Sequence, residues 1–439
     1  MQHRGQEGAG IAVISGNTII CHKNQGLVSE VFSGNSLKEL NSHVAVGHCR
    51  FSNSGETSIN VITGNINEDI QPVFTEYLTG RLATVHDGNV INAKELKDEL
   101  MTYGIAFMGT SDSEIISKLI AYHCTKQMNV LDGVKVAANL LKGAFSLIVL
   151  STENNKLIAV RDSSGFRPLC IGKNDLGVAI ASESCALDTC EFDFVRDIRP
   201  GEIVVVENGS IAFEETILTP KIKNTGICIF EYVYVARPDS FIDNLSVYEA
   251  RVNMGRILAK ENPVEADAVC GVPDSGLEAA AGYSEESGIP LIQGLVRNRY
   301  VGRSFIYPTQ EQRENAVKLK FNALKSNIEN KRIVLVDDSL VRGTSTEKIV
   351  RLMKNAGAKE VHMRIASPPV KYACHFGVNV NNEKNLIASR MSIDDIRKKI
   401  CADSLSYISI NGLKQACGEC SLPRCAHCFD SREVGDLEV

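Results

Sequence analysis

The segment that most constrains the fold is residues 333–346, Ile-Val-Leu-Val-Asp-Asp-Ser-Leu-Val-Arg-Gly-Thr-Ser-Thr. The four leading apolar residues are typical of a buried parallel strand. Asp337 and Asp338 follow where this strand ends, and a loop of small and hydroxyl residues over 339–346 leads into an amphipathic helix predicted over 347–355. Ligands of open α/β sheets bind at the carboxyl ends of the strands. The segment therefore predicts an α/β fold with a ligand site at this point of the chain.

The composition of the loop indicates the chemistry of the ligand. A helix start offers backbone N–H groups to an anion, and small residues let the backbone approach a phosphate. The acidic pair suits a ribose diol or a magnesium ion that the substrate carries. A phosphate, a sugar and a magnesium pyrophosphate together describe phosphoribosyl pyrophosphate. The alternative is a plain strand–turn–helix in which Asp338 or Ser339 only caps the helix.

The whole segment resembles the phosphoribosyl pyrophosphate signature of the type I phosphoribosyltransferases. The resemblance implies that the substrate is bound by Asp337, Asp338, Ser339, Arg342, Gly343, Thr344 and Ser345. A second loop, over 272–276, also ends a predicted strand and opens a helix, so it is a second candidate for anion or metal binding. Its Ser275 joins Asp337 and Asp338 as a candidate magnesium ligand.

A basic segment precedes the signature. Residues 297–303 contain three arginines beside a glycine, and Arg303 is a candidate for substrate binding. Arginine suits a phosphate-binding lid because its planar guanidinium grips phosphate through two hydrogen bonds. The alternative is a solvated basic loop.

Composition excludes several classes of protein. The net charge of −6 gives no reason to expect binding to nucleic acid or to an anionic membrane surface. No apolar run is long enough to span a bilayer, and the first residues do not form a signal peptide. We therefore expect a cytoplasmic protein with small-molecule substrates.

The length of 439 residues allows two or three domains, and the chain changes character near 207–227, which is polar and irregular. We expect a mixed α+β domain over 1–220 and an α/β domain over 221–439. In the first, the patterns predict helices over 92–103, 112–126 and 132–142, and strands over 11–14, 44–46, 82–85, 144–150, 157–161, 178–181 and 203–206. In the second, they predict helices over 246–261 and 276–287, and strands over 267–272, 290–295, 333–336 and 361–365.

Motifs throughout the chain are similar to those of the glutamine phosphoribosylpyrophosphate amidotransferase family. They lie in residues 2–11, 47–52, 86–89, 111–114, 160–168, 181–188 and 231–240. The resemblance implies an N-terminal-nucleophile glutaminase domain followed by a type I phosphoribosyltransferase domain. It implies transfer of ammonia from glutamine to C1 of phosphoribosyl pyrophosphate, giving 5-phosphoribosylamine and pyrophosphate in the first step of purine synthesis. It also implies a homotetramer that purine nucleotides inhibit.

The resemblance assigns roles in glutamine binding. Arg50 binds the α-carboxylate, Asp112 binds the α-ammonium, and the Asp87–Gly88 turn forms the oxyanion hole, where turn N–H groups face the developing charge. The alternative is that Arg50 and Asp112 form one structural ion pair.

The chain departs from the family in two respects. Family members begin with a catalytic cysteine whose α-amine is the general base, whereas Met1 aligns with the family's first helix and Cys21 and Cys49 lack the right context. The oxyanion-hole asparagine is Asp87, which repels an oxyanion when ionised and could donate a hydrogen bond only if burial raised its pKa. We therefore expect no glutamine hydrolysis. Either the sequence is truncated, as the retained glutamine-binding residues favour, or the protein uses free ammonia.

Fourteen cysteines are many for such a chain. The iron–sulfur branch of the family holds a [4Fe–4S] cluster with four cysteines, and the resemblance assigns this role to Cys228, Cys374, Cys425 and Cys428. Cys417 and Cys420 are an alternative for the tail pair. A zinc site of the four tail cysteines is the rival, although its middle spacer of four residues is short for zinc.

Two other functions remain as alternatives. A phosphoribosyltransferase that acts on a free base would not need the glutaminase-like half. A regulatory iron–sulfur protein that binds phosphoribosyl pyrophosphate or nucleotides would explain Asp87, but not the intact acidic pair and Arg342.

Overall fold

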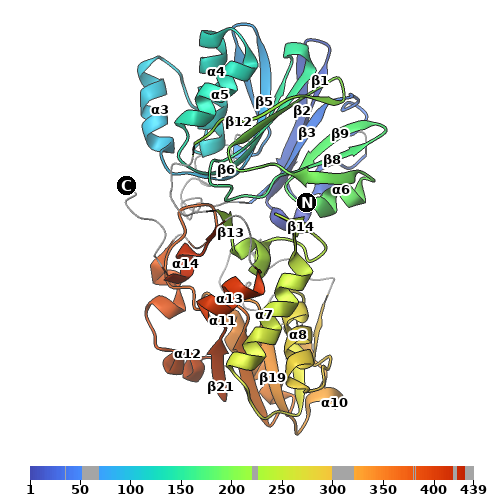
Figure 1. The fold of residues 1–439 in the computed structure, drawn as a ribbon, viewed down its shortest axis with the longest axis vertical. Coiled ribbons are helices and arrows are strands. Elements are labelled where there is room, and N and C mark those ends of the chain that lie inside the picture. Colours follow the sequence, from blue (N-terminus) through green and yellow to red (C-terminus); the bar gives the residue numbers. More distant parts are fainter. Residues whose placement is uncertain are drawn as a thin grey trace.

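The computed structural model describes residues 1–34, 36–51, 69–219, 226–298, 321–378, 380, 382–418 and 423–430. Two bodies are stacked along the long axis of the molecule, and the N-terminus lies where they meet (Figure 1). The predicted boundary between 220 and 221, Arg303 and Cys420 all lie outside the described residues.

A six-stranded antiparallel sheet is the centre of the first half, with the strand order β12-β11-β7-β6-β5-β4. Its strands are β4 Val73–Tyr77, β5 Gly80–Val90, β6 Gly143–Ser151, β7 Lys156–Arg161, β11 Glu202–Glu207 and β12 Ser210–Thr216. One face packs against the helices α3 Ala93–Thr102, α4 Asp112–Gln127 and α5 Val130–Leu140, as the sequence predicted. Leu82 and Leu147 of the sheet meet Ile116 and Ile120 of α4 in this core.

Two smaller sheets cover the opposite face. One has the order β2-β1-β3, and the other has the order β10-β8-β9. Their strands are β1 Gly8–Ser15, β2 Thr18–Gln25, β3 Ala45–Arg50, β8 Cys170–Asn174, β9 Gly177–Ala181 and β10 Asp193–Asp197. Ala12 and Val46 pack here against Ala83 and Val85 of β5. The first half is thus a mixed α/β structure with a helical layer on one face of two stacked sheet layers. The short helices α1 Val28–Val31 and α6 Ser184–Thr189 lie at its margins.

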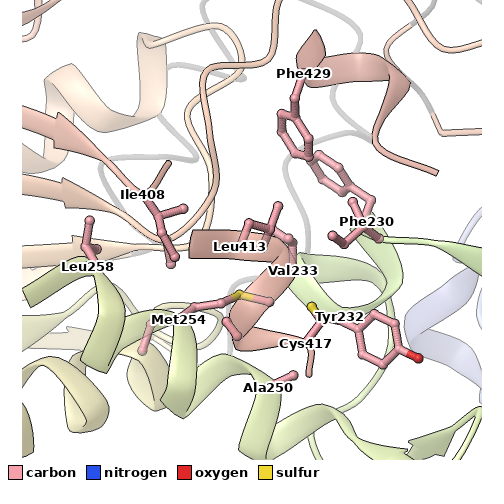
Figure 2. Close-up of a cluster of buried hydrophobic side chains, with 14 of the residues drawn as sticks. Phe230, Tyr232, Val233, Ala250, Met254, Leu258, Ile408, Leu413, Cys417 and Phe429 are labelled. Atoms are coloured by element: carbon pink, nitrogen blue, oxygen red, sulfur yellow. The ribbon is translucent and has the colours of Figure 1, made fainter. Parts of the chain in front are cut away.

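The second half contains the predicted parallel sheet, in the order β16-β19-β20-β21. The strands are β16 Ala268–Gly271, β19 Arg332–Asp337, β20 Glu360–Ile365 and β21 Ser404–Tyr407. Successive residues of β19 point to opposite faces. Val334 and Val336 pack towards α7 Val247–Glu261, α8 Leu277–Ser287 and α13 Ile410–Ala416, while Ile333 and Leu335 pack towards α11 Thr344–Asn355 and α12 Ile393–Lys399. Figure 2 shows part of the first of these cores.

The remaining elements are short. They are η1 Gln2–Arg4, η3 Glu153–Asn155, the π-helix η4 Glu231–Val235, η6 Glu383–Asn385, η7 Ile387–Ser389, α10 Lys325–Ile328, α14 His427–Asp430, and the paired strands β13 Ile227–Cys228 with β22 Arg424–Cys425, β14 Phe241–Ile242 with β15 Leu245–Ser246, and β17 Leu295–Arg297 with β18 Phe321–Ala323. Among the described residues, no helix is both long and apolar enough to cross a membrane.

Two predicted elements differ from the structure. The strand predicted over 290–295 is reduced to one parallel bridge between Leu291 and Val269, and the chain then enters the antiparallel pair β17–β18. The helix after the acidic pair begins at Thr344 rather than at residue 347. Gly343 has φ of 79° and forms the N-cap, so the left-handed turn ends the loop there. Thr344 and Ser345 therefore belong to the first helical turn and not to the loop.

Candidate active site

The parallel sheet brings the two candidate phosphate and metal loops together. Gly271 of β16 is in register with Val336 of β19, and the Val272 N–H donates to the Val336 carbonyl at 2.8 Å. A Cβ on Gly276 would lie 2.5 Å from that same carbonyl oxygen, so only glycine fits between the loops. The Asp338 carboxylate consequently receives hydrogen bonds from the side chains of both Ser275 and Ser339.

The predicted magnesium ligands are thus neighbours. The Asp338 N–H donates to Asp337 Oδ1 at 3.0 Å, and Ser275 contacts Asp338. Burial raises the pKa of Asp338, and the hydrogen bonds from the two serines oppose that rise. Such a carboxyl group is stabilised in its ionised form by a cation at this position.

Arg251 of α7 is a functional candidate that the motifs did not reveal. It is buried, donates to the carbonyl oxygens of Tyr232 at 2.8 Å and Ala236 at 2.7 Å, and its charge opposes the pKa rise of Asp338. The available signal was an arginine on the apolar stripe of a predicted helix, since Val247, Met254 and Leu258 share its face.

The start of α11 supplies the predicted anion loop. Arg342, Thr344 and Ser345 are exposed around Gly343, where the first N–H groups of the helix have no intrahelical acceptor. Nearby, Arg297 forms an ion pair with Asp274. The substrate role assigned to Arg303 lies outside the described residues.

A second constellation lies in the first half, between β3, β5 and α4. Side chains alternate along a strand, so Val46, His48 and Arg50 share the face of β3 that packs on the six-stranded sheet. On β5, Asp87 shares its face with Ala83 and Val85. The predicted Asp87–Gly88 turn is instead part of this strand, because both residues pair with β6. Arg50 and Asp87 therefore come from two layers that face each other, whereas Asp112 stands at the start of α4 on the other face of the six-stranded sheet.

Arg50 and Asp112 have different partners. Arg50 lies 3.7 Å from Glu7 and 3.9 Å from Asp69, measured between charged atoms. The Asp112 carboxylate accepts from the Val90 N–H at 3.1 Å and lies 3.7 Å from His86 Nδ1. Within the described ranges no ion pair joins Arg50 to Asp112, so the alternative of one structural ion pair is not what the structure contains.

Two histidines at this site were missed by the sequence analysis. Burial, with the charges of His86 and Arg50, lowers the pKa of His48 to about 4, although Asp87 opposes that shift. His48 Nδ1 and His86 Nε2 are buried and have no hydrogen-bond partner in the part of the chain that the structure describes. Both residues stand in the motifs that carried the family resemblance, which was the signal available.

Asp87 is ionised rather than protonated. Its Oδ2 accepts from Arg4 Nη2 at 3.0 Å, and its Oδ1 lies 4.0 Å from Arg167 Nε. Burial alone would raise the pKa of Asp87, but Arg167 and Arg4 hold it well below its usual range. The expectation that burial could protonate Asp87 is therefore wrong here, because two cations outweigh the loss of water. Asp87 has no proton to donate to an oxyanion.

The same arginines join the two halves of the molecule. Arg4 donates at 2.8 Å to Glu183 and to Glu231, and Arg167 donates to Glu231 at 2.9 Å. Glu183 and Glu231 have fully buried side chains. A buried carboxylate without its partners is strongly destabilising, so this cluster fixes how β5 and η1 sit on the second half.

The four predicted cluster cysteines lie near one another at the same interface. The parallel pair β13–β22 places Cys228 opposite Cys425. Burial raises the pKa of the Cys428 thiol, and the charges of Cys228, Cys374 and Cys425 raise it further, so the fourth cysteine is also close. None of these four is in a disulfide. The four cysteines come from three separate places in the chain, and their role as cluster ligands stays a prediction.

The four thiols are mutually repulsive as thiolates, and their donor set suits a cationic iron–sulfur group. In the described residues, no three His, Cys, Asp or Glu side chains converge closely enough to hold a single metal ion. Cys417 packs in an apolar cluster with Val233 and Ala250 (Figure 2), which is the position of a small core residue. Its carbonyl accepts from Arg424 at 2.6 Å.

Comparison with known proteins gives two family matches, a glutamine amidotransferase domain over residues 57–189 and a phosphoribosyl transferase domain over 249–366. The amidophosphoribosyltransferase of Methanocaldococcus jannaschii is 44% identical, with 98% of this chain and 92% of the relative covered. That of Bacillus subtilis is 40% identical, with 98% and 89% covered.

Two solved structures are similar over nearly the whole chain. The glutamine phosphoribosylpyrophosphate amidotransferase from B. subtilis, complexed with ADP and GMP, has a TM-score of 0.87 at 39% identity, with 98% of this chain and 92% of that chain covered. A structure described as the allosteric regulatory enzyme of purine biosynthesis has a TM-score of 0.88 at 39% identity, with 100% and 93% covered.

Proposed function

The chain belongs to the amidophosphoribosyltransferase family, and we propose that it catalyses the family's reaction with free ammonia as the nitrogen donor. The reaction joins ammonia to C1 of phosphoribosyl pyrophosphate and releases pyrophosphate. It is the first step of purine synthesis. The transferase assignment rests on one observation: Ser275 and Ser339 both donate hydrogen bonds to the Asp338 carboxylate, beside the start of α11.

Each part of the substrate has candidate partners in the second half. The α11 start with Arg342, Gly343, Thr344 and Ser345 would bind the phosphate, because helix N–H groups and hydroxyls face it. Asp337, Asp338 and Ser275 would hold magnesium, which neutralises charge on the pyrophosphate. As the C1–oxygen bond breaks, negative charge grows on the leaving group. Arg303 and Arg342 would stabilise that charge, so the protein acts mainly by positioning and electrostatics.

The use of free ammonia is supported by Asp87. An ionised carboxylate beside a tetrahedral intermediate raises its energy, where the family's amide would lower it. Cys49, the cysteine next to Arg50, is not a candidate nucleophile for a glutamine bound by Arg50. It points to the opposite face of β3, and burial raises its pKa. Arg50 and Asp112 would keep their roles toward the glutamine zwitterion if that substrate binds.

The four neighbouring cysteines, three of them buried, support membership of the iron–sulfur branch. Cys228, Cys374, Cys425 and Cys428 would hold a [4Fe–4S] cluster, whose role there is structural. We also propose the domain boundary between 220 and 221, purine nucleotides as inhibitors, and a homotetramer. The bound ADP and GMP of the B. subtilis structure support the nucleotide proposal.

The test is pyrophosphate release from phosphoribosyl pyrophosphate and magnesium, on anaerobically purified protein, with ammonium or glutamine as donor. We expect release with ammonium alone. Release with glutamine would overturn the free-ammonia proposal and leave the transferase assignment intact. No release with either donor would contradict the proposed reaction and favour the regulatory alternative.

A further inference from the structure

The segment that carries Cys374 touches the turn at Asp87. The Asn89 side chain donates from Nδ2 to the His375 carbonyl at 2.8 Å. Gly377 has φ of +96°, and a Cβ at this position would lie 3.0 Å from the Gly88 carbonyl carbon and 2.8 Å from Arg167 Nη2. These contacts join residues 87–89, which lie within strand β5 and for which we keep the name of the predicted turn, to residues 374–377, here named the cysteine segment.

The cysteine segment is in turn fixed by the cysteine group. The Phe376 N–H donates to Cys374 Sγ at 3.3 Å, and the Phe376 ring stacks on Phe166 with centroids 4.3 Å apart. The Phe166 carbonyl accepts from the Cys228 N–H at 3.0 Å. Cys374 therefore contacts Phe376 directly and Cys228 is linked to it through Phe166, and Phe376 lies between the two residues that contact the turn.

We propose that the cysteine segment is a positioning element for the turn, with Asn89 and Gly377 as its positioning residues, so that occupancy of the four-cysteine site sets the order of the turn. Coupling between two sites is reciprocal, so a disturbed turn also alters assembly at the cysteines. The inference rests on the proposed roles of the turn and the cysteines, but its test measures order rather than turnover. Its failure is thus distinct from failure of the proposed reaction.

The first test measures amide hydrogen exchange of residues 86–90 in the whole protein. One sample is reconstituted anaerobically with ferrous iron and sulfide, and its loading is followed by iron content and visible absorption. The other is stripped with a chelator. We expect exchange at the turn to be about fivefold slower in the loaded protein, the effect of about one hydrogen bond. Equal exchange in both samples would overturn the proposal.

Asn89→Ala shows whether the contact carries the effect. The variant should load iron as the wild type does, yet lose the difference in exchange between loaded and stripped samples. The matched control is Asn327→Ala, since Asn327 Nδ2 also donates to a backbone carbonyl at 2.8 Å, that of Gln293, away from the turn. It should keep the difference. An Asn89→Ala protein that keeps it would remove Asn89 from the coupling and overturn its role.

A second test does not depend on iron uptake. Gly377→Ala drives a Cβ into the Gly88 backbone, whereas Gly288→Ala has similar left-handed strain, with φ of +71° and nothing within 4 Å of the added Cβ. We expect faster exchange at 86–90 in Gly377→Ala alone. Equal exchange in the two variants would show that the segment does not position the turn.

Discussion

Asp338 and Asp87 are both aspartates near the carboxyl end of a strand, but their surroundings differ in kind. Asp338 receives neutral hydroxyl donors and its pKa is raised, whereas Asp87 lies against two arginines and its pKa is lowered. The first is a carboxyl group that a cation would stabilise. The second already has its cations, and these two arginines also bind Glu231 of the second half. The sequence motif alone does not tell these two cases apart.

The largest effect should come from removing the charge of Glu231, the carboxylate that links the two halves. Glu231→Gln removes the fully buried carboxylate that binds both Arg4 and Arg167, and breaking such a pair costs about 3–5 kcal/mol. Denaturant unfolding would measure this loss. Glu214→Gln is the control, because Glu214 is half exposed beside Arg196, and its loss should cost about 1 kcal/mol or less. If both variants lost the same unfolding free energy, the buried cluster would be no more important to stability than an exposed ion pair.

Asp338→Asn tests the proposed cation-binding role of Asp338, the other aspartate of the comparison. An amide cannot supply the negative charge that a bound cation needs, so ammonia-dependent pyrophosphate release should fall on the order of 100-fold. Asp394→Asn, in the exposed first turn of α12, is the control and should leave the rate unchanged. An active Asp338→Asn protein would show that the acidic pair does not serve the substrate.

Asp87→Asn should lower stability at pH 7 by about 1 kcal/mol, because the carboxylate is partly exposed and its ion pairs are screened. The folded-state pKa of Asp87 is depressed, so its contribution is present above the unfolded pKa near 4 and is lost as pH falls. Unfolding free energies of the two proteins should therefore converge in acid. A gap that widens as pH falls would contradict the lowered pKa.

The smallest effect concerns Asp197, a carboxyl group of the first half for which burial and Asp243 raise the pKa to about 6. A raised folded-state pKa stabilises the protein below the unfolded pKa, near 4, and this contribution is lost as pH rises through 6. Asp197→Asn should reduce that loss between pH 4 and pH 6 by about 1 kcal/mol. Unfolding at several pH values checks the sign, and an unchanged slope would refute it.

The sequence predicted the parallel sheet because buried strands leave a local apolar pattern, whereas the roles of the acidic pair and the four cysteines stay predictions, those of the cysteines resting on the family resemblance alone. It did not predict the state of Asp87, since Arg4 and Arg167 reach that residue from distant parts of the chain. The start of α11 was misplaced because hydroxyl residues suit both a loop and a first helical turn, and only the backbone at Gly343 distinguishes them. Arg251 was missed because no motif contains it.

The pairing of β13 with β22 has a consequence for folding. Ile227–Cys228 opens the second half and Arg424–Cys425 stands near its end, so nearly the whole second half lies between two strands that must pair. Contacts between distant residues form slowly because a long loop must close first. During synthesis the first half leaves the ribosome before residues 424–425 do. The β13–β22 pair can therefore form only after nearly all of the second half has been made. The pairing of Cys228 with Cys425 is therefore completed last, and a protein shortened before residue 424 would lack it.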